Sequence, residues 1–302
     1  MISLAQTLVV ESPRHTPRRI PFASRMIGAV GPVLFLALLV QAFLRQGVAV
    51  WSIGIAYILY DTALLVFTAW NIRGLRHAPV ASATTPTPSF GVIVAAHNEA
   101  PVIAAAIDRL AGQAESPDLI LIADDGSSDA TAEVLSRRYA LAVPALGDIT
   151  ERSSVLPSLR WLRLPHGGKA RALNDAMLQI DTTVVLTVDA DTLLEPGAIA
   201  AMRAAFAAEP ELVAATGVLA PICGPDVQGR LFQWFQSYEY VRNFLSRHAW
   251  EQLGSLLLIS GAFAAFRRDA VVAVGGFDPD CMVEDYELIH RLHRHAVDNG
   301  YD

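Results

Sequence analysis

Residues 183–191, TVVLTVDAD, form an apolar run that ends in two carboxylates. A run of this kind is typical of a strand buried on both faces of a sheet. Side chains alternate along a strand, so an extended path through Ala190 would point Asp189 and Asp191 the same way from its carboxyl end. Because Mg and Mn accept carboxylate and phosphate oxygens together, we expect this pair to hold a metal diphosphate. A solvated turn after a strand is the alternative.

Strand-like and helix-like segments alternate from Phe90 onward. Apolar runs of strand length are followed by segments whose apolar residues have helical spacing. This alternation predicts an α/β fold with right-handed crossovers, a mainly parallel sheet and flanking helices. The predicted strands are residues 90–95, 119–123, 159–164 and the run ending at Asp189, and the predicted helices are residues 100–110, 129–139 and 169–180.

Polar clusters follow three of these predicted strands. They are His97-Asn98-Glu99, Asp124-Asp125-Gly126-Ser127 and Asp189-Ala190-Asp191. Ligands bind at the carboxyl ends of the strands in parallel sheets, so the repetition favours one shared cleft. Taken alone, the second cluster fits an Asx turn with a helix N-cap better than a ligand site.

Residues 166–174, HGGKARALN, lead through glycines into a predicted helix. The N-terminus of that helix, together with Lys169, would favour an anion. A glycine-initiated helix with a surface lysine is an equal alternative. The spacing is not that of a Walker P-loop, which argues against an ATP or GTP hydrolase.

Residues 260–288 contain a glycine-broken apolar strand, a short helix, a Gly-Gly turn and then Glu284-Asp285 at the start of a helix. A carboxylate at a helix start interacts favourably with the helix dipole. In a cleft beside a metal diphosphate it is also a natural general base for an attacking hydroxyl. For HRLHRH, residues 290–295, we expect a solvated helix surface and not a metal site.

Composition indicates that part of the chain lies in lipid. Of the 302 residues 53% are hydrophobic and the mean hydropathy is +0.36, which is too apolar for an ordinary soluble enzyme. The formal net charge is -7 and the basic residues are scattered, so we expect no nucleic-acid partner. The two cysteines lack a metal-ligand spacing, and a reducing environment fits them.

The apolar excess predicts two transmembrane helices, residues 27–44 and 48–70, separated by a gap so short that they must form a hairpin. We expect residues 1–26 to be a cytoplasmic N-terminal segment, residues 71–89 a linker, and residues 90–302 the cytoplasmic catalytic domain of a multi-pass inner-membrane protein. The arginines flanking the hairpin set this orientation by the positive-inside rule. They are Arg14, Arg18, Arg19, Arg25, Arg73 and Arg76. A cleaved signal peptide is the rival interpretation of the first run.

Seven motifs occur in the order and approximate spacing of the family 2 glycosyltransferases with the GT-A fold. They are AAHNEA, DDGSSD, GGKARALN, DAD, SGAF, GGFD and VEDYEL. The chain resembles most the membrane-bound, processive branch that includes bacterial cellulose, poly-N-acetylglucosamine and hyaluronan synthases. The resemblance covers the chain from about Phe90 to its end, and the helix hairpin before it also matches that branch.

The resemblance implies an inverting transfer from a nucleotide sugar to a saccharide hydroxyl in polysaccharide synthesis. The leading donor class that it implies is a UDP-sugar, with glucose or N-acetylglucosamine. Divalent metal, Mg or Mn, is the implied cofactor, with Asp189 and Asp191 as its ligands. Asp285 is the implied base, with Glu284 beside it as the next candidate. The residues implied to bind the nucleotide sugar are Glu99, Asp124, Asp125, Lys169 and Asp189. The implied partners are the donor, the acceptor, the lipid bilayer and other synthase subunits.

Two departures from the family pattern stand out. His97 lies within AAHNE where many relatives have P-x-Y-N-E, and no Q-x-x-R-W motif follows the ED segment. We therefore expect a chain that is truncated at its C-terminal end or divergent. Two alternatives stay open: a polyprenyl-phosphate glycosyltransferase, and a catalytically inert nucleotide-binding membrane subunit.

Overall fold

The computed structural model describes residues 3–13, 16, 20–44, 51–75, 87–254 and 258–299. Its centre is one six-stranded sheet in the order β3-β2-β1-β4-β6-β5. The strands are β1 Phe90–Ala96, β2 Leu119–Asp125, β3 Leu159–Leu164, β4 Val184–Asp189, β5 Ala214–Thr216 and β6 Phe263–Arg267. Strands β1 to β4 run parallel, and β6 is antiparallel to both β4 and β5. The predicted mainly parallel sheet is confirmed.

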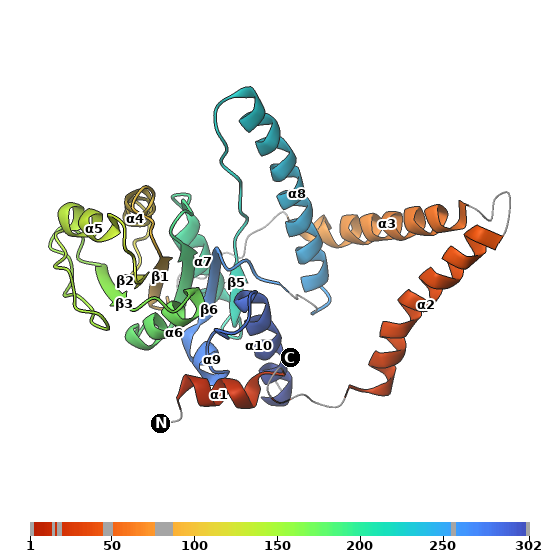
Figure 1. The fold of residues 1–302 in the computed structure, drawn as a ribbon, viewed down its shortest axis with the longest axis horizontal. Helices are drawn as coiled ribbons and strands as arrows, with labels where there is room; N and C mark the ends of the chain where they lie inside the picture. The colour runs from red at the N-terminus through yellow and green to blue at the C-terminus, as the bar shows by residue number, and fades with distance from the viewer. Residues whose placement is uncertain are drawn as a thin grey trace.

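Helices cover both faces of the sheet (Figure 1). On one face, apolar strand residues pack against α4 Ile103–Ala111, α5 Thr131–Tyr139 and α7 Ala198–Ala208. On the other face, the strands pack against α6 Lys169–Gln179, α9 Arg268–Ala273 and α10 Glu284–Asn299. Because both faces are covered, the inner strands are apolar on both sides, which explains their continuous β-branched runs.

Strand register brings the polar clusters to one edge of the sheet. Ala95 of β1 lies opposite Asp189 of β4, and Ala96 lies opposite Asp124 of β2. These pairs lie at the carboxyl ends of three adjacent parallel strands. The shared cleft predicted from the sequence therefore has a structural basis at this edge.

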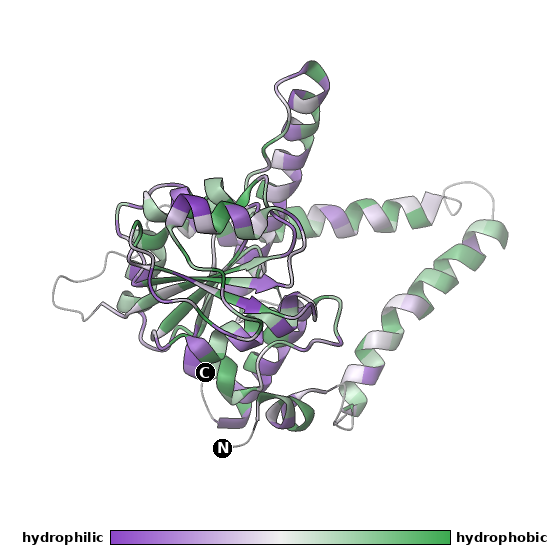
Figure 2. Ribbon diagram, turned by 60° about the vertical axis from the view of Figure 1, so that its left-hand side comes forward, coloured by the Kyte–Doolittle hydropathy of each residue, from purple (hydrophilic) through white to green (hydrophobic). Residues whose placement is uncertain are grey.

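Two long apolar helices, α2 Phe22–Leu44 and α3 Ser52–Asn71, extend away from the sheet (Figures 1 and 2). By length and composition both could cross a membrane, and their described residues include none that is buried. Helix α2 begins at Phe22, before the predicted start at Ile27. Residues 45–50 of the predicted hairpin and 77–86 of the predicted linker lie outside the described residues. So do four of the flanking arginines, Arg14, Arg18, Arg19 and Arg76.

Helix α8, Val227–Glu251, also projects from the domain (Figure 1). Near its C-terminal end Trp250 contacts Phe67 of α3, with 4.8 Å between the ring centroids. Much of the rest of α8 exposes large apolar side chains, including Leu231, Phe232, Trp234 and Phe235. The motifs and apolar patterns of the sequence did not predict this helix.

The N-terminal segment forms helix α1, Leu4–Glu11, which packs against the α/β domain. Leu8 is buried, and the Ser12 hydroxyl donates to Glu287 Oε1 at 3.0 Å. A side chain on Gly275, which has φ +89°, would collide with the backbone of Leu8. The chain before the hairpin is therefore held on the domain by a close backbone approach that glycine permits.

Glu287 belongs to a buried ion pair in α10. Arg291 Nη2 lies 2.6 Å from its carboxylate, and the guanidinium also donates to the carbonyls of Val274 and Gly276. Arg291 is 0% exposed. The expectation of a solvated surface for residues 290–295 is therefore wrong at this position, because the arginine satisfies the carbonyls around the Gly-Gly turn.

Gly275→Ala should lower the free energy of unfolding by about 1–2 kcal/mol, because alanine is strained at positive φ. It should also displace α1 and speed proteolysis between α1 and α2. Thermal unfolding and limited trypsin digestion would measure both effects. Gly197→Ala is the matched control, since its φ is -100° and a Cβ there meets nothing within 4 Å. Equal behaviour of the two variants would contradict the close approach of α1.

Candidate active site

A cavity of about 240 Å³ lies at the carboxyl ends of β1, β2 and β4. Its lining residues are Ala95, Ala96, His97, Glu99, Asp125, Lys169, Asp189, Ala190 and Asp191. Five of the residues singled out from the sequence are thus brought together: Glu99, Asp125, Lys169, Asp189 and Asp191. We call this space the donor-side cavity.

Asp189 and Asp191 flank a buried alanine. Ala190 is 3% exposed and packs in the core, so the carboxylates on either side of it can face the cavity. Asp189 Oδ1 lies 2.5 Å from the Lys169 ammonium. Strand β4 ends at Asp189, and Ala190 and Asp191 lie in a turn closed by a hydrogen bond from the Thr192 amide to the Asp189 carbonyl at 2.9 Å. The extended path through Ala190 expected from the sequence is therefore wrong, and it is the turn that leaves both carboxylates on the cavity lining.

Glu99 lies in a strongly negative environment. Burial raises the pKa of its carboxyl, and the charges of Asp191, Asp129 and Asp189 raise it further. Carboxylates that repel one another in this way are stabilised by a cation, and hard oxygen donors suit Mg or Mn. The residues present therefore fit a divalent metal.

Asp125 connects β2 to the start of α6. Its carboxylate accepts hydrogen bonds from the backbone amides of Gly167 (2.7 Å) and Gly168 (2.9 Å). Gly126 has φ +68°, and a Cβ there would lie 2.6 Å from the backbone nitrogen of His166. This close packing fixes the loop before α6 and thereby positions Lys169, the first residue of that helix.

Asp124 is placed differently from its neighbour. It is 0% exposed, its carboxylate accepts from Trp161 Nε1 (3.2 Å) and from the Ser127 amide (2.8 Å), and it is not among the residues lining the donor-side cavity. Adjacent strand residues point to opposite faces, so only one aspartate of the pair can face the cavity. Asp124 shapes the turn after β2.

Glu284 and Asp285 lie at the start of α10 and are not among the residues that line the donor-side cavity. Glu284 Oε1 lies 3.8 Å from the Lys169 ammonium, and Asp285 Oδ2 accepts from the Gly261 amide at 2.9 Å. A Cβ on Gly261 would lie 2.9 Å from that same oxygen. The glycine of the SGAF motif is therefore what lets Asp285 reach the loop before β6.

Two histidines at this site were not identified as site residues from the sequence. The rings of His97 and His166 stack with 4.4 Å between centroids, and His166 Nδ1 lies 2.9 Å from Asp125 Oδ2. With Asp125 they form a group whose ligand atoms could hold a metal ion. The signal available was the departure at His97, but the two histidines meet only in the folded chain.

Residues 91–275 match the family model described as Glycosyl transferase family 2. This chain belongs to glycosyltransferase family 2. The prediction made from the ordered motifs is therefore confirmed, and the chain is a glycosyltransferase.

Two curated relatives are poly-beta-1,6-N-acetyl-D-glucosamine synthases. The Staphylococcus aureus (strain COL) protein is 29% identical over 205 residues, which cover 67% of this chain and 45% of the relative. The Staphylococcus epidermidis protein is 26% identical over 214 residues, covering 70% of this chain and 47% of the relative. The glycosyltransferase thus spans less than half the length of these relatives.

A solved structure supports the fold. The mannosyltransferase PcManGT from Pyrobaculum calidifontis, in complex with GDP-Man and Mn²⁺, superposes with a TM-score of 0.55 at 22% identity, covering 86% of this chain and 63% of that one. The predicted GT-A fold is confirmed.

Asp191→Asn should weaken the Mn-dependent part of UDP binding by at least about tenfold, because an anionic ligand of a hard cation is lost. Titration calorimetry of UDP with and without Mn would measure the effect. Asp181→Asn is the control, since Asp181 is exposed before the opposite end of β4. If Mn strengthened UDP binding equally in parent and Asp191→Asn, Asp191 would not be a ligand.

Proposed function

We propose that this glycosyltransferase is a membrane-anchored, inverting enzyme that transfers a sugar from a UDP-linked donor to a saccharide hydroxyl during polysaccharide synthesis. The observation that carries the proposal is the convergence of Glu99, Asp125, Lys169, Asp189 and Asp191 on one cavity. The ion pairs of Lys169 with Asp189 and Glu284 connect that cavity to the start of α10.

The donor half of the reaction rests on the cavity. We assign Glu99 and Asp125 to the nucleoside, whose base N–H and ribose hydroxyls can donate to carboxylates. Lys169 lies at a helix start, where both its ammonium and the helix dipole favour the diphosphate. Asp189 and Asp191 would hold Mg or Mn, which when bound neutralises the leaving diphosphate. Asp124 would support this site indirectly, because its hydrogen bonds to Trp161 and to the turn after β2 fix the strand end that carries Asp125.

The acceptor half rests on Asp285. Its carboxylate takes the proton from an acceptor hydroxyl as that oxygen attacks the anomeric carbon. A bond forms between the acceptor oxygen and the anomeric carbon, while the bond from that carbon to the donor phosphate oxygen breaks on the opposite face. The configuration inverts in one step, without a covalent enzyme intermediate.

N-acetylglucosamine is the sugar we favour. The similarity to two poly-beta-1,6-N-acetyl-D-glucosamine synthases supports UDP-N-acetylglucosamine as donor and a β-1,6-linked chain as acceptor. Relatives cover the catalytic region of this chain, which is the part that would select the sugar.

We assign α2 and α3 to the inner membrane, with the catalytic domain in the cytoplasm. Two contacts support this arrangement: the close packing of the Leu8 backbone on Gly275 and the hydrogen bond from the Ser12 hydroxyl to Glu287. A segment packed on the domain must lie on the same side of the membrane as the domain. The two helices of one hairpin cross the membrane twice, which returns the chain to the side on which it started. The flanking arginines favour the cytoplasmic side.

Cysteine labelling from outside intact cells tests this topology. In a variant with Cys223 and Cys281 replaced by alanine, an impermeant maleimide should modify Gln46→Cys and leave Ser89→Cys unmodified. Lysed cells provide the control, since both cysteines should then react. Labelling of Ser89→Cys alone in intact cells would overturn the orientation and the access to cytoplasmic nucleotide sugars.

Asp285→Asn tests the reaction itself. The substitution keeps the side-chain volume but removes the proton acceptor, so sugar transfer should fall by about two to four orders of magnitude with little change in donor binding. Transfer from radiolabelled UDP-N-acetylglucosamine by the purified protein would measure this.

Asp298→Asn, on the same helix and beyond the cavity, is the matched control and should transfer like the parent. A purely capping role of Asp285 predicts the opposite result, because asparagine caps helices well. Similar rates in Asp285→Asn and parent would make Glu284 the next candidate base. A parent that binds UDP but neither hydrolyses nor transfers the sugar would support the inert-subunit alternative.

A further inference from the structure

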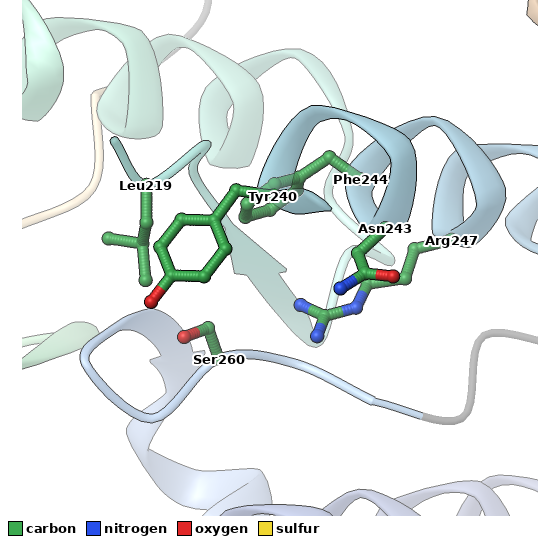
Figure 3. Close-up of a pocket in the computed structure, with 6 residues that line it drawn as sticks. All are labelled: Leu219, Tyr240, Asn243, Phe244, Arg247 and Ser260. Carbon is green, nitrogen blue, oxygen red and sulfur yellow. The ribbon is translucent and has the colours of Figure 1, made fainter. Parts of the chain in front are cut away.

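A second cavity lies between α8 and the loop before β6, with a volume of about 190 Å³ (Figure 3). Its lining residues are Leu219, Tyr240, Asn243, Phe244, Arg247 and Ser260. We call it the α8 cavity. None of these residues lines the donor-side cavity.

The segment from Ser260 to Ala262 joins the two cavities. Ser260 lines the α8 cavity, the amide of Gly261 donates to Asp285, and the carbonyl of Ala262 accepts from the Asp189 amide at 3.4 Å. Glu284 meanwhile approaches Lys169 on the donor side. Glu284 and Asp285, the first two residues of α10, therefore interact with different cavities. Glu284 lies near Lys169 on the donor side, and Asp285 lies on the side of the α8 cavity.

We propose that the α8 cavity binds the terminal sugar ring of the acceptor saccharide, with Tyr240, Asn243 and Arg247 as the residues that select it. This inference rests on the proposed function, because it places the hydroxyl that Asp285 would deprotonate. It assigns acceptor recognition to a helix in which no catalytic motif was found.

The lining chemistry suits a sugar. Figure 3 shows the Tyr240 ring beside Leu219 with its hydroxyl toward Ser260, while Asn243 and Arg247 extend toward the space from the next turns of α8. Aromatic and aliphatic walls can cover the apolar face of a pyranose, and the amide, guanidinium and hydroxyl groups can bond its hydroxyls. Pockets for drug-sized ligands measure roughly 300–1,000 Å³, so this smaller cavity fits a single ring.

Arg247 is held in place for this role. Its guanidinium lies over the Phe244 ring, 5.3 Å from the centroid. Burial lowers the pKa of the Arg247 side chain, and the charge of Asp285 partly offsets that effect. The arginine therefore remains a donor of hydrogen bonds whose positive charge is balanced by Asp285.

That balance favours a neutral hydroxyl over a lipid phosphate as the group that enters. A phosphate would bring up to two negative charges beside Asp285, against the single cation that Arg247 supplies to the cavity lining. A phosphate oxygen also needs no base to remove a proton. An alcohol needs both a donor to orient it and a carboxylate to accept its proton, and Arg247 with Asp285 offers both.

Saccharide titration of the full protein tests the inference. With saturating UDP and Mn, binding of a β-1,6-linked N-acetylglucosamine tetrasaccharide is measured by calorimetry for the parent, Tyr240→Ala, Asn243→Ala and Arg247→Gln. Each variant should bind the saccharide about tenfold more weakly or worse, with an unchanged Kd for UDP, which also reports correct folding. Tyr238→Ala, on an exposed part of α8 that does not line the cavity, is the control and should bind like the parent.

The remaining outcomes separate the two ideas. If parent and cavity variants bind the saccharide equally, or the parent binds UDP but no saccharide, the acceptor site is overturned while the donor half of the proposed function stands. Binding of farnesyl phosphate in place of the saccharide, lost in Arg247→Gln, would also overturn it in favour of a lipid-phosphate acceptor. A parent that binds no UDP with Mn would overturn the proposed function and this inference together.

Discussion

The hydrogen bonds from two glycine amides to the Asp125 carboxylate are the interaction on which the active site depends. They fix the end of β2 to the loop that starts α6, and that loop positions Lys169. The lysine in turn pairs with Asp189 at the end of β4 and approaches Glu284 at the start of α10. Loss of this one buried carboxylate would remove two charge-assisted hydrogen bonds from the loop before α6, and Lys169 would lose the support that positions it between Asp189 and Glu284.

The donor-side cavity and the α8 cavity are bounded by different kinds of structural element. The donor-side cavity lies at the ends of parallel strands that are buried on both faces, so its carboxylates have little freedom to move. The α8 cavity is bounded by a projecting helix and by the loop that ends at β6. A metal diphosphate requires fixed oxygen ligands, whereas a growing acceptor must enter and leave. A donor side built on the sheet and a proposed acceptor side bounded by a projecting helix would match those separate demands.

Sequence patterns predicted the sheet and most of the donor-side residues, because strand runs and their polar ends are local features. Which of two adjacent aspartates faces the cavity depends on the partner of each, and Trp161, which binds Asp124, is distant in the sequence. The α8 cavity was missed for a similar reason. Tyr240 and Arg247 have no motif spacing, and they come to line a cavity only where α8 meets the loop before β6. Helix α1 was missed because it is short and is stabilised by packing against Gly275.

The packing of α1 has a mechanical consequence. Helices α2 and α3 are attached to the catalytic domain at both ends, through α1 before them and through β1 after them. A domain held to its anchor by one linker can swivel, and relative motion is then the ordinary expectation. Two attachment points restrict that rotation more than a single linker would. In a bilayer, the mouth of the donor-side cavity would then sample fewer orientations relative to the lipid surface.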